Sequence, residues 1–128
     1  MPINPNGLNV TFNLDITTNQ DNTLDIKGTT NLYDSAHLLL TISNSTDYPM
    51  AQSKSKVENG NFNFGRLGKK GIGFQKGEYQ IEITLSVPSQ QDKTFISKAG
   101  TEYENLSGPF IDRDWISPTG SYTEKYEI

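Results

Sequence analysis

The chain has 128 residues, a formal net charge of −4 and no cysteine. A chain of this length forms one domain of ordinary size, and without disulfides its stability must come from packing. The negative charge and the lack of a lysine and arginine stripe argue against a nucleic-acid partner. No apolar run is long enough to cross a bilayer, so we expect no membrane insertion.

Residues 1–7 are rich in proline, asparagine and glycine, and we expect a flexible N-terminal arm before a single domain at 8–128. The arm has neither the basic start nor the hydrophobic stretch of a secretory leader. Two locations therefore stay open. The protein is cytoplasmic, or a leader was removed and it works outside the cytoplasm or in the cell envelope.

Alternating apolar and polar residues predict strands in the first half of the chain, because successive side chains of a strand point to opposite faces. The pattern predicts one strand over residues 8–16 and a second over 24–30. The continuous apolar run at 38–43 predicts a strand that is buried on both faces or lies in a central position. Residues 50–58 are polar with alternating lysines, which is typical of a protected edge strand.

An asparagine–glycine pair at residues 59–60 is the strongest short hairpin signal, because both residues accept the positive φ angles of a type I′ turn. The glycine-rich and lysine-rich residues 65–77 predict a long, mobile loop. The clearest strand of the chain follows at 79–87, where every second residue is apolar.

Signals weaken after this strand. Residues 89–107 are compatible with irregular structure or with one short helical turn near 89–100, since Gly100 interrupts the apolar spacing. A short strand is expected at 109–111. A closing strand is expected where one face carries Tyr122, Glu124, Tyr126 and Ile128.

Seven or eight strands with a turn about every ten residues predict an all-β fold, namely a single immunoglobulin-like antiparallel β-sandwich. The chain has no cysteine pair like that of antibody domains. The comparison with immunoglobulin domains therefore concerns architecture alone.

Residues 28–35 read Gly-Thr-Thr-Asn-Leu-Tyr-Asp-Ser, and an apolar strand follows. This resembles the corner motif Gly-x-Thr-Asn-Leu-Pro-Asp-Gly of small bacterial immunoglobulin-like β-sandwich modules. The chain departs from the motif at Tyr33, which replaces the proline, and at Ser35, which replaces the glycine. Asn31 and Asp34 stand where a tight corner needs short hydrogen-bonding side chains.

Further segments of this resemblance lie at 57–62, 77–83 and 106–109, so that it covers residues 24–111. Such modules look like appendages of bacterial exported or mobile-element proteins, mostly without an assigned activity. The resemblance therefore implies the fold more than any function.

No strong catalytic signature stands out. His37 is the only histidine, and the chain has no cysteine that could act with it as a nucleophile, so we expect a structural or solvent-facing role. Glu102, Glu104, Asp112 and Asp114 could line a calcium site, although solvated loop charges are the favoured interpretation. We predict no catalytic residue, no cofactor and no metal site, and leave calcium binding by these four acids open.

Loops and polar-tipped aromatic side chains are the features that most often carry recognition. The final strand could also add to a sheet of a partner. The candidate contact residues are Lys69, Lys70, Lys76, Trp115, Tyr122 and Tyr126.

We therefore expect a non-catalytic module that binds another macromolecule, with a protein as the favoured partner and a glycan as the alternative. Our first hypothesis is an accessory domain of a bacterial exported or cell-envelope protein. The alternative is a small phage or mobile-element inhibitor that binds and blocks a host enzyme in the cytoplasm. The oligomeric state stays open.

Overall fold

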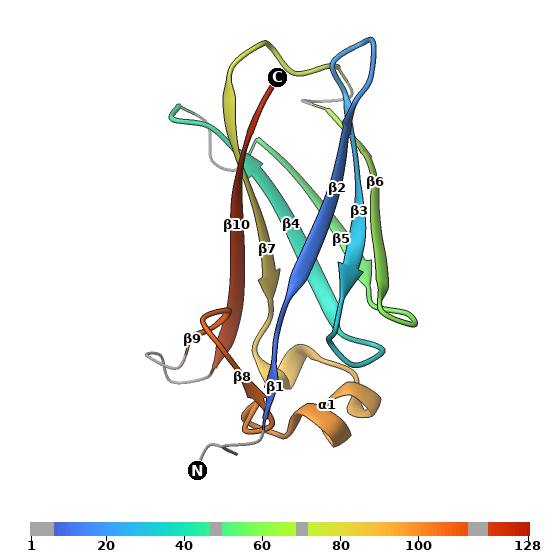
Figure 1. Ribbon diagram of the computed structural model, residues 1–128, viewed down its shortest axis with the longest axis vertical. Helices are drawn as coiled ribbons and strands as arrows, with labels where there is room; N and C mark the ends of the chain where they lie inside the picture. Colours follow the sequence, from blue (N-terminus) through green and yellow to red (C-terminus); the bar gives the residue numbers. More distant parts are fainter. Residues whose placement is uncertain (1–6, 47–49, 69–71, 113–117) are drawn as a thin grey trace.

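The computed structural model describes residues 7–46, 50–68, 72–112 and 118–128, which form an elongated body of two facing β-sheets (Figure 1). One sheet has the strand order β5-β4-β7-β10-β9, and the other has the order β2-β3-β6. A short parallel pair, β1 and β8, lies at the lower end. The described strands are β1 (Leu8–Asn9), β2 (Phe12–Thr18), β3 (Leu24–Thr30), β4 (His37–Ser43), β5 (Ala51–Lys56), β6 (Asn61–Leu67), β7 (Glu78–Leu85), β8 (Leu106–Ser107), β9 (Ile111–Asp112) and β10 (Thr119–Glu127).

The prediction of an all-β fold is confirmed, and the core follows from the alternation in the sequence. In β7, every second side chain from Tyr79 to Leu85 is buried between the sheets, while Gln80 is exposed. The facing strands β3 and β6 contribute Leu24, Ile26 and two phenylalanines. Each such side chain contributes about 1.5–3 kcal/mol when buried.

The predicted first strand at 8–16 is two strands in the structure. β1 pairs with β8, whereas β2 pairs with β3, so the chain changes partner between them. Asn31 secures this junction, because its side chain accepts the Thr11 N–H at 2.9 Å and donates to the Asn9 carbonyl at 2.7 Å. The predicted corner residue thus bonds a neighbouring segment of chain.

The central and edge strands lie at the positions predicted from the sequence. β4 lies between β5 and β7, and β5 forms one edge of its sheet. The turn after β5 has φ angles of 53° at Asn59 and 78° at Gly60, as the predicted hairpin requires. Asp34, the second corner residue, accepts the N–H of Asn59 at 2.8 Å.

The loop predicted at 65–77 is shorter than expected, because β6 continues through Gly65 to Leu67. Phe74 fixes the described part of this loop to the body. Its side chain is buried against the ring of Tyr79, with 5.4 Å between centroids, and its N–H donates to the Asn22 carbonyl at 2.9 Å.

A 3-10 turn, η1 (Pro88–Gln90), and one short helix, α1 (Lys93–Ala99), connect β7 to β8 at the lower end. The helix buries Phe95 and Ala99 and ends at Gly100, whose φ is 95°. Beyond it, Tyr103 is fully buried and donates to the Ser86 carbonyl. Burial raises the pKa of the Tyr103 hydroxyl. No helix of the described residues is long and apolar enough to span a membrane.

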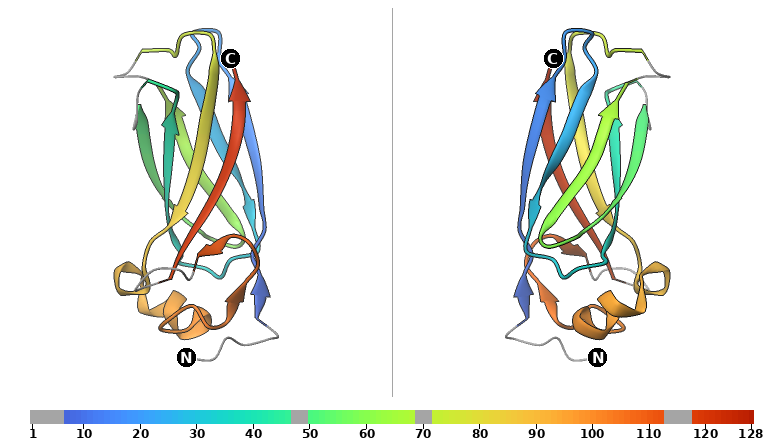
Figure 2. Two further views of the ribbon diagram at one scale, coloured as in Figure 1. Left: turned by 90° about the vertical axis from the view of Figure 1, so that its left-hand side faces the viewer. Right: turned by 90° about the vertical axis from the view of Figure 1, so that its right-hand side faces the viewer.

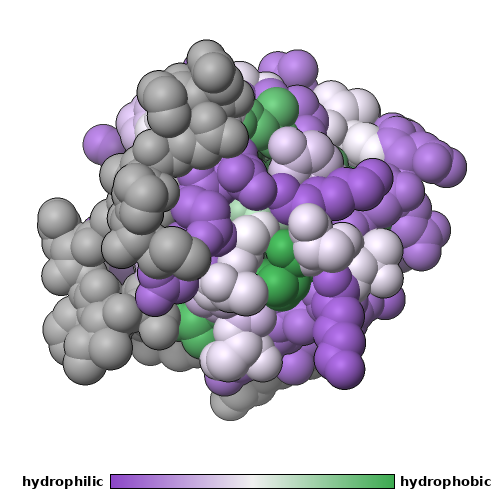
Figure 3. All heavy atoms as spheres, turned by 90° about the horizontal axis from the view of Figure 1, so that it is seen from below, coloured by the Kyte–Doolittle hydropathy of each residue, from purple (hydrophilic) through white to green (hydrophobic). Residues whose placement is uncertain are grey.

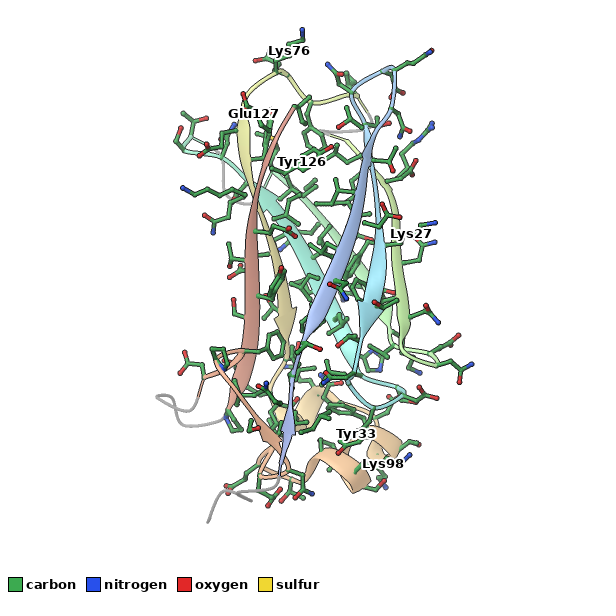
Figure 4. The ribbon with its side chains drawn as sticks, in the orientation of Figure 1. Lys27, Tyr33, Lys76, Lys98, Tyr126 and Glu127 are labelled. Carbon is green, nitrogen blue, oxygen red and sulfur yellow. The ribbon has the colours of Figure 1, made fainter. Side chains whose placement is uncertain are left out.

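Asp92 joins the start of α1 to the five-stranded sheet. Its carboxylate oxygens lie 2.9 Å from His37 Nε2 and 2.8 Å from Lys56 Nζ. Hydrogen bonds from Lys56 and then from His37 lower the pKa of Asp92. At the same end, the Nζ atom of Lys98 lies 6.0 Å from the centroid of the Tyr33 ring. Both of these residues are labelled in Figure 4.

Seen from below, the described residues of this end are mostly hydrophilic or intermediate, and hydrophobic ones show only as small separate areas (Figure 3). The described residues visible from this side therefore form no contiguous apolar patch of the kind that marks a contact site. The most informative surface lies instead along the side of the sandwich.

Candidate functional site

β2 is an edge strand of the three-stranded sheet, and β10 is followed in the five-stranded sheet only by the two-residue strand β9 at its start. β2 and β10 run side by side along the sandwich (Figure 1; left view of Figure 2). Within the described residues, no backbone ladder joins them. β2 pairs with β3, and β10 pairs with β7 and, at its start, with β9. We call the space between β2 and β10 the seam.

The lower end of the seam is filled by residues 105–112, which we call the plug segment. On one side, the N–H of Leu8 donates to the carbonyl of Asn105 at 2.8 Å. On the other side, the N–H of Ser121 donates to the carbonyl of Phe110 at 2.9 Å. At this end, the plug segment supplies backbone partners to β10 and to β1, the short strand that precedes β2.

Phe110 is the inward anchor of the plug segment. Its ring packs against that of Phe12, with 4.8 Å between centroids, and only 6% of the residue is exposed. It lies directly over Gly120 of β10, where an added Cβ would come within 2.2 Å of the ring. Glycine is therefore required at this point of the closing strand.

Above the plug segment, one edge of β10 is open. Ile128 and Gly77 exchange two backbone hydrogen bonds, of 2.9 and 3.2 Å, at the end of the β10–β7 ladder. Backbone N–H and C=O groups point to alternate sides along a strand, so those of the even-numbered residues of β10 point toward β7. The odd-numbered residues Thr123, Lys125 and Glu127 direct their N–H and C=O groups away from β7, toward the seam.

The edge of β2 is open in the same way. The N–H of Asn19 donates to the carbonyl of Thr23 at 2.9 Å. The backbone N–H and C=O groups of the odd-numbered residues of β2 therefore point toward β3. Leu14, Ile16 and Thr18 consequently direct their backbone groups into the seam. Along its upper part, two strand edges thus face one another without a backbone partner among the described residues.

In the part of the chain that the structure describes, the bridges across the upper seam are made by side chains. The rings of Phe12 and Tyr122 lie 5.6 Å apart between centroids, and the hydroxyl oxygens of Thr18 and Tyr126 are 2.6 Å apart. Tyr126 can be followed between the two strands in Figure 4. All of these side chains belong to the inward faces of their strands. The half-buried Leu14 and Ile16 lie between the two bridges on β2.

Glu124 lies on the inward face of β10, between the two tyrosines. Its Oε2 atom is buried and has no hydrogen-bond partner among the described residues. Burial, and then the charge of this carboxylate, raise the pKa of Tyr122. An unpartnered buried carboxylate oxygen costs stability, so its position calls for an explanation.

A cleft of about 350 Å³ opens in the seam directly above the plug segment. It is bounded by both edge strands and by the plug. Its lining residues are Val10, Thr11, Phe12, Pro109, Phe110, Ser121, Tyr122 and Thr123.

The structure brings together only part of the predicted contact surface. Tyr122 and Tyr126 both line the seam, and Lys76 is exposed beside the upper end of β10 (Figure 4). Lys69, Lys70 and Trp115 lie outside the described residues. No role was predicted for Glu124 from the sequence, although an acid at an inward position of the closing strand was the available signal.

The acidic residues considered for calcium are not assembled into a site in the described part of the chain. Asp114 lies outside it, and no group of three or more histidine, cysteine, aspartate or glutamate side chains there could hold a metal ion. Glu104 instead accepts the N–H of Glu102 at 3.2 Å.

A larger hollow, of about 700 Å³, lies on the outer face of the three-stranded sheet and extends to the end of β5. Polar side chains dominate it, among them Asn13, Asp15, Lys27 and Thr29. Lys27 extends outward from β3 in Figure 4. The central strand β3 is paired on both sides, so the hollow offers side chains rather than free backbone groups.

Comparisons with protein-family models, with curated proteins and with solved structures gave no significant match. The function therefore has to be argued from the geometry of the chain itself.

Proposed function

We propose that the protein is a non-catalytic, immunoglobulin-like module that binds another protein through the upper seam. The observation that carries the proposal is the pair of unpaired strand edges, lined by half-buried apolar and tyrosine side chains. A free edge offers a row of backbone donors and acceptors to an extended segment of a partner.

Three features support this surface over the rest of the described molecule. The cleft above the plug segment gives a partner side chain a place to enter. Tyr122 and Tyr126 combine an apolar ring with a polar tip, a combination that is common at interfaces. The edge of β10 already accepts a backbone partner lower down, where the chain provides the plug segment.

The test uses proline as an edge blocker. Lys125→Pro removes an N–H that points into the seam but takes part in no ladder bond, so the fold tolerates it better than at an inner position. Lys125→Thr is the matched control, because it removes the same charge and keeps the N–H. A photo-crosslinking residue at position 125, compared with one at position 54 on the far edge, identifies the partner.

We expect one defined partner to crosslink at position 125 and not at 54. The purified partner should bind the threonine variant normally and the proline variant at least tenfold more weakly. Equal binding of that partner to both folded variants would overturn the proposal.

The polar hollow favours a second candidate function, the binding of a glycan. Amide, hydroxyl and charged side chains around Asn13, Asp15 and Thr29 could hydrogen-bond the hydroxyl groups of a sugar. Screening the protein and its Asn13→Ala variant against a glycan array tests this. A glycan bound equally by both proteins would contradict this location.

For the wider context, we propose an accessory domain of a bacterial exported or cell-envelope protein. The alternative remains a phage or mobile-element inhibitor of a host enzyme. A signal peptide or lipobox in the uncut gene would support the first. A cytoplasmic host enzyme recovered by the crosslink at position 125 would support the second.

A further inference from the structure

We infer that the upper seam is selective for an extended segment that places a lysine or arginine opposite Glu124, between two apolar residues. The inference rests on the proposed function and adds the chemistry of the partner. Its basis is the juxtaposition of an unpaired edge of β10 with a buried carboxylate oxygen that has no partner in the described part of the chain.

The position of Glu124 determines which partner residue would meet it. An added strand pairs with the edge that β9 already occupies lower down, and it runs antiparallel to β10 as β9 does. Directly opposite residues of antiparallel strands have Cβ atoms about 4.5–5.5 Å apart on the same face. The partner residue opposite Glu124 therefore points inward, to the carboxylate.

The neighbours of Glu124 define the flanking positions. Tyr122 and Tyr126 stand two residues away on either side, and across the seam lie the half-buried Leu14 and Ile16. The partner residues two positions before and two positions after the basic one would pack against these tyrosine and aliphatic side chains. The expected pattern is apolar, any residue, basic, any residue, apolar, with its odd members facing the core.

A lysine or arginine side chain compensates the carboxylate of Glu124 better than a neutral hydrogen-bond donor does. A neutral donor would leave the charge uncompensated in a partly buried place, whereas lysine or arginine forms a charge-assisted hydrogen bond. A second copy of this chain fits poorly. In a pairing that occupied the same inward site, two β10 edges would run antiparallel with Glu124 opposite Glu124, and like charges placed opposite each other are destabilising.

An inward charge on an edge strand also has a purely protective role, since it discourages accidental strand pairing. Protection predicts that Glu124 weakens every added strand. Recognition predicts that it weakens neutral strands and strengthens basic ones. The two accounts therefore differ in the sign of the effect on a basic peptide.

The experiment uses the full chain and two capped pentapeptides with valine at both ends and threonine at the second and fourth positions. One carries lysine at its inward central position, and the other carries the uncharged norleucine. Fluorescence anisotropy gives the dissociation constants for the wild-type protein, for Glu124→Gln and for Glu127→Gln. The last variant is the matched control, since it removes an acid from an outward-facing position of the same strand.

We expect the lysine peptide to bind the wild type and Glu127→Gln about tenfold more tightly than the norleucine peptide, because one charge-assisted bond is gained. In Glu124→Gln, the two peptides should bind equally. Hydrogen exchange should show protection of the Thr123 and Lys125 amides in the complex.

Two results would overturn the inference in distinguishable ways. If both peptides protect the Thr123 and Lys125 amides and bind the wild type equally, edge binding stands but selectivity through Glu124 is wrong. If neither peptide binds or protects these amides, the strand-binding edge itself is wrong, and the proposed function fails with it.

Discussion

The two ends of the seam are completed differently. At the lower end, the plug segment supplies backbone partners to β10 and to β1, the strand before β2, and places the ring of Phe110 in the core. At the upper end, side chains such as Tyr126 and Thr18 meet across the gap, while the backbone edges stay unpaired.

The difference shows how one sandwich separates stability from recognition. Where the chain fills its own seam, the inward position of β10 is a glycine that leaves room for Phe110. Where it does not, the inward position is Glu124, whose buried oxygen lacks a partner among the described residues. The plug segment completes the core at the lower end. At the upper end, we expect a bound partner to complete it.

The largest effect is expected from removing the anchor of the lower end. Phe110→Ala should lower the free energy of unfolding by about 3–5 kcal/mol, because it deletes a buried aromatic side chain. Leu14→Ala in the upper seam should cost only about 1 kcal/mol, since this side chain is half-exposed. Chemical denaturation of both variants measures the contrast.

Gly120→Ala sharpens the same comparison. Its added methyl group overlaps the Phe110 ring, so the single variant should be destabilised. In the Phe110→Ala background, the overlap is gone and the further cost should largely disappear. Equal costs in both backgrounds would contradict the packing of Phe110 over Gly120.

A smaller effect of opposite sign is expected in the upper seam. Glu124→Leu replaces a buried unpartnered oxygen with an apolar side chain and should raise the free energy of unfolding by about 0.5–1 kcal/mol. The same change should abolish preference for a basic peptide. Loss of stability in a variant that stays folded would mean that Glu124 has a stabilising contact of its own.

The smallest effect concerns the support of the lower end by Asp92. Because the pKa of Asp92 is lowered in the folded protein, its bonds to Lys56 and His37 stabilise the fold at pH values above the ordinary pKa of a carboxyl group. This contribution is lost as the pH falls through the lowered pKa. The stability difference between wild type and Asp92→Asn should therefore be constant near neutral pH and shrink below about pH 4.

Hydrogen exchange localises this acid effect. Weakening the Asp92 contacts should speed exchange of the Leu8 and Ser121 amides, which bond the plug segment, before that of the β7 ladder. A uniform acceleration along the whole chain would show that Asp92 has no particular link to the lower end.

Much of the fold could be predicted because it follows from local patterns. The alternation around Ile81 and the turn at Asn59-Gly60 each determine their structure within a few residues. The division of the first predicted strand could not be foreseen. It arises because β1 pairs with β8, about a hundred residues further along the chain, and local periodicity carries no information about such a partner.

The candidate site was predictable only in part for the same reason. The aromatic pattern indicated Tyr122 and Tyr126, but not that they face β2 across an open seam. That Glu124 lies inward followed from its parity with the tyrosines. Its lack of a partner depends on the arrangement of two sheets, which only the three-dimensional structure displays.

Amide hydrogen exchange along β10 tests the central claim most directly. In the free protein, Tyr122, Glu124 and Tyr126 should exchange slowly because they pair with β7. Thr123, Lys125 and Glu127 should exchange rapidly and become protected when a partner binds. Slow exchange of these three odd-numbered amides in the free protein would contradict the account, because the edge would then already be paired.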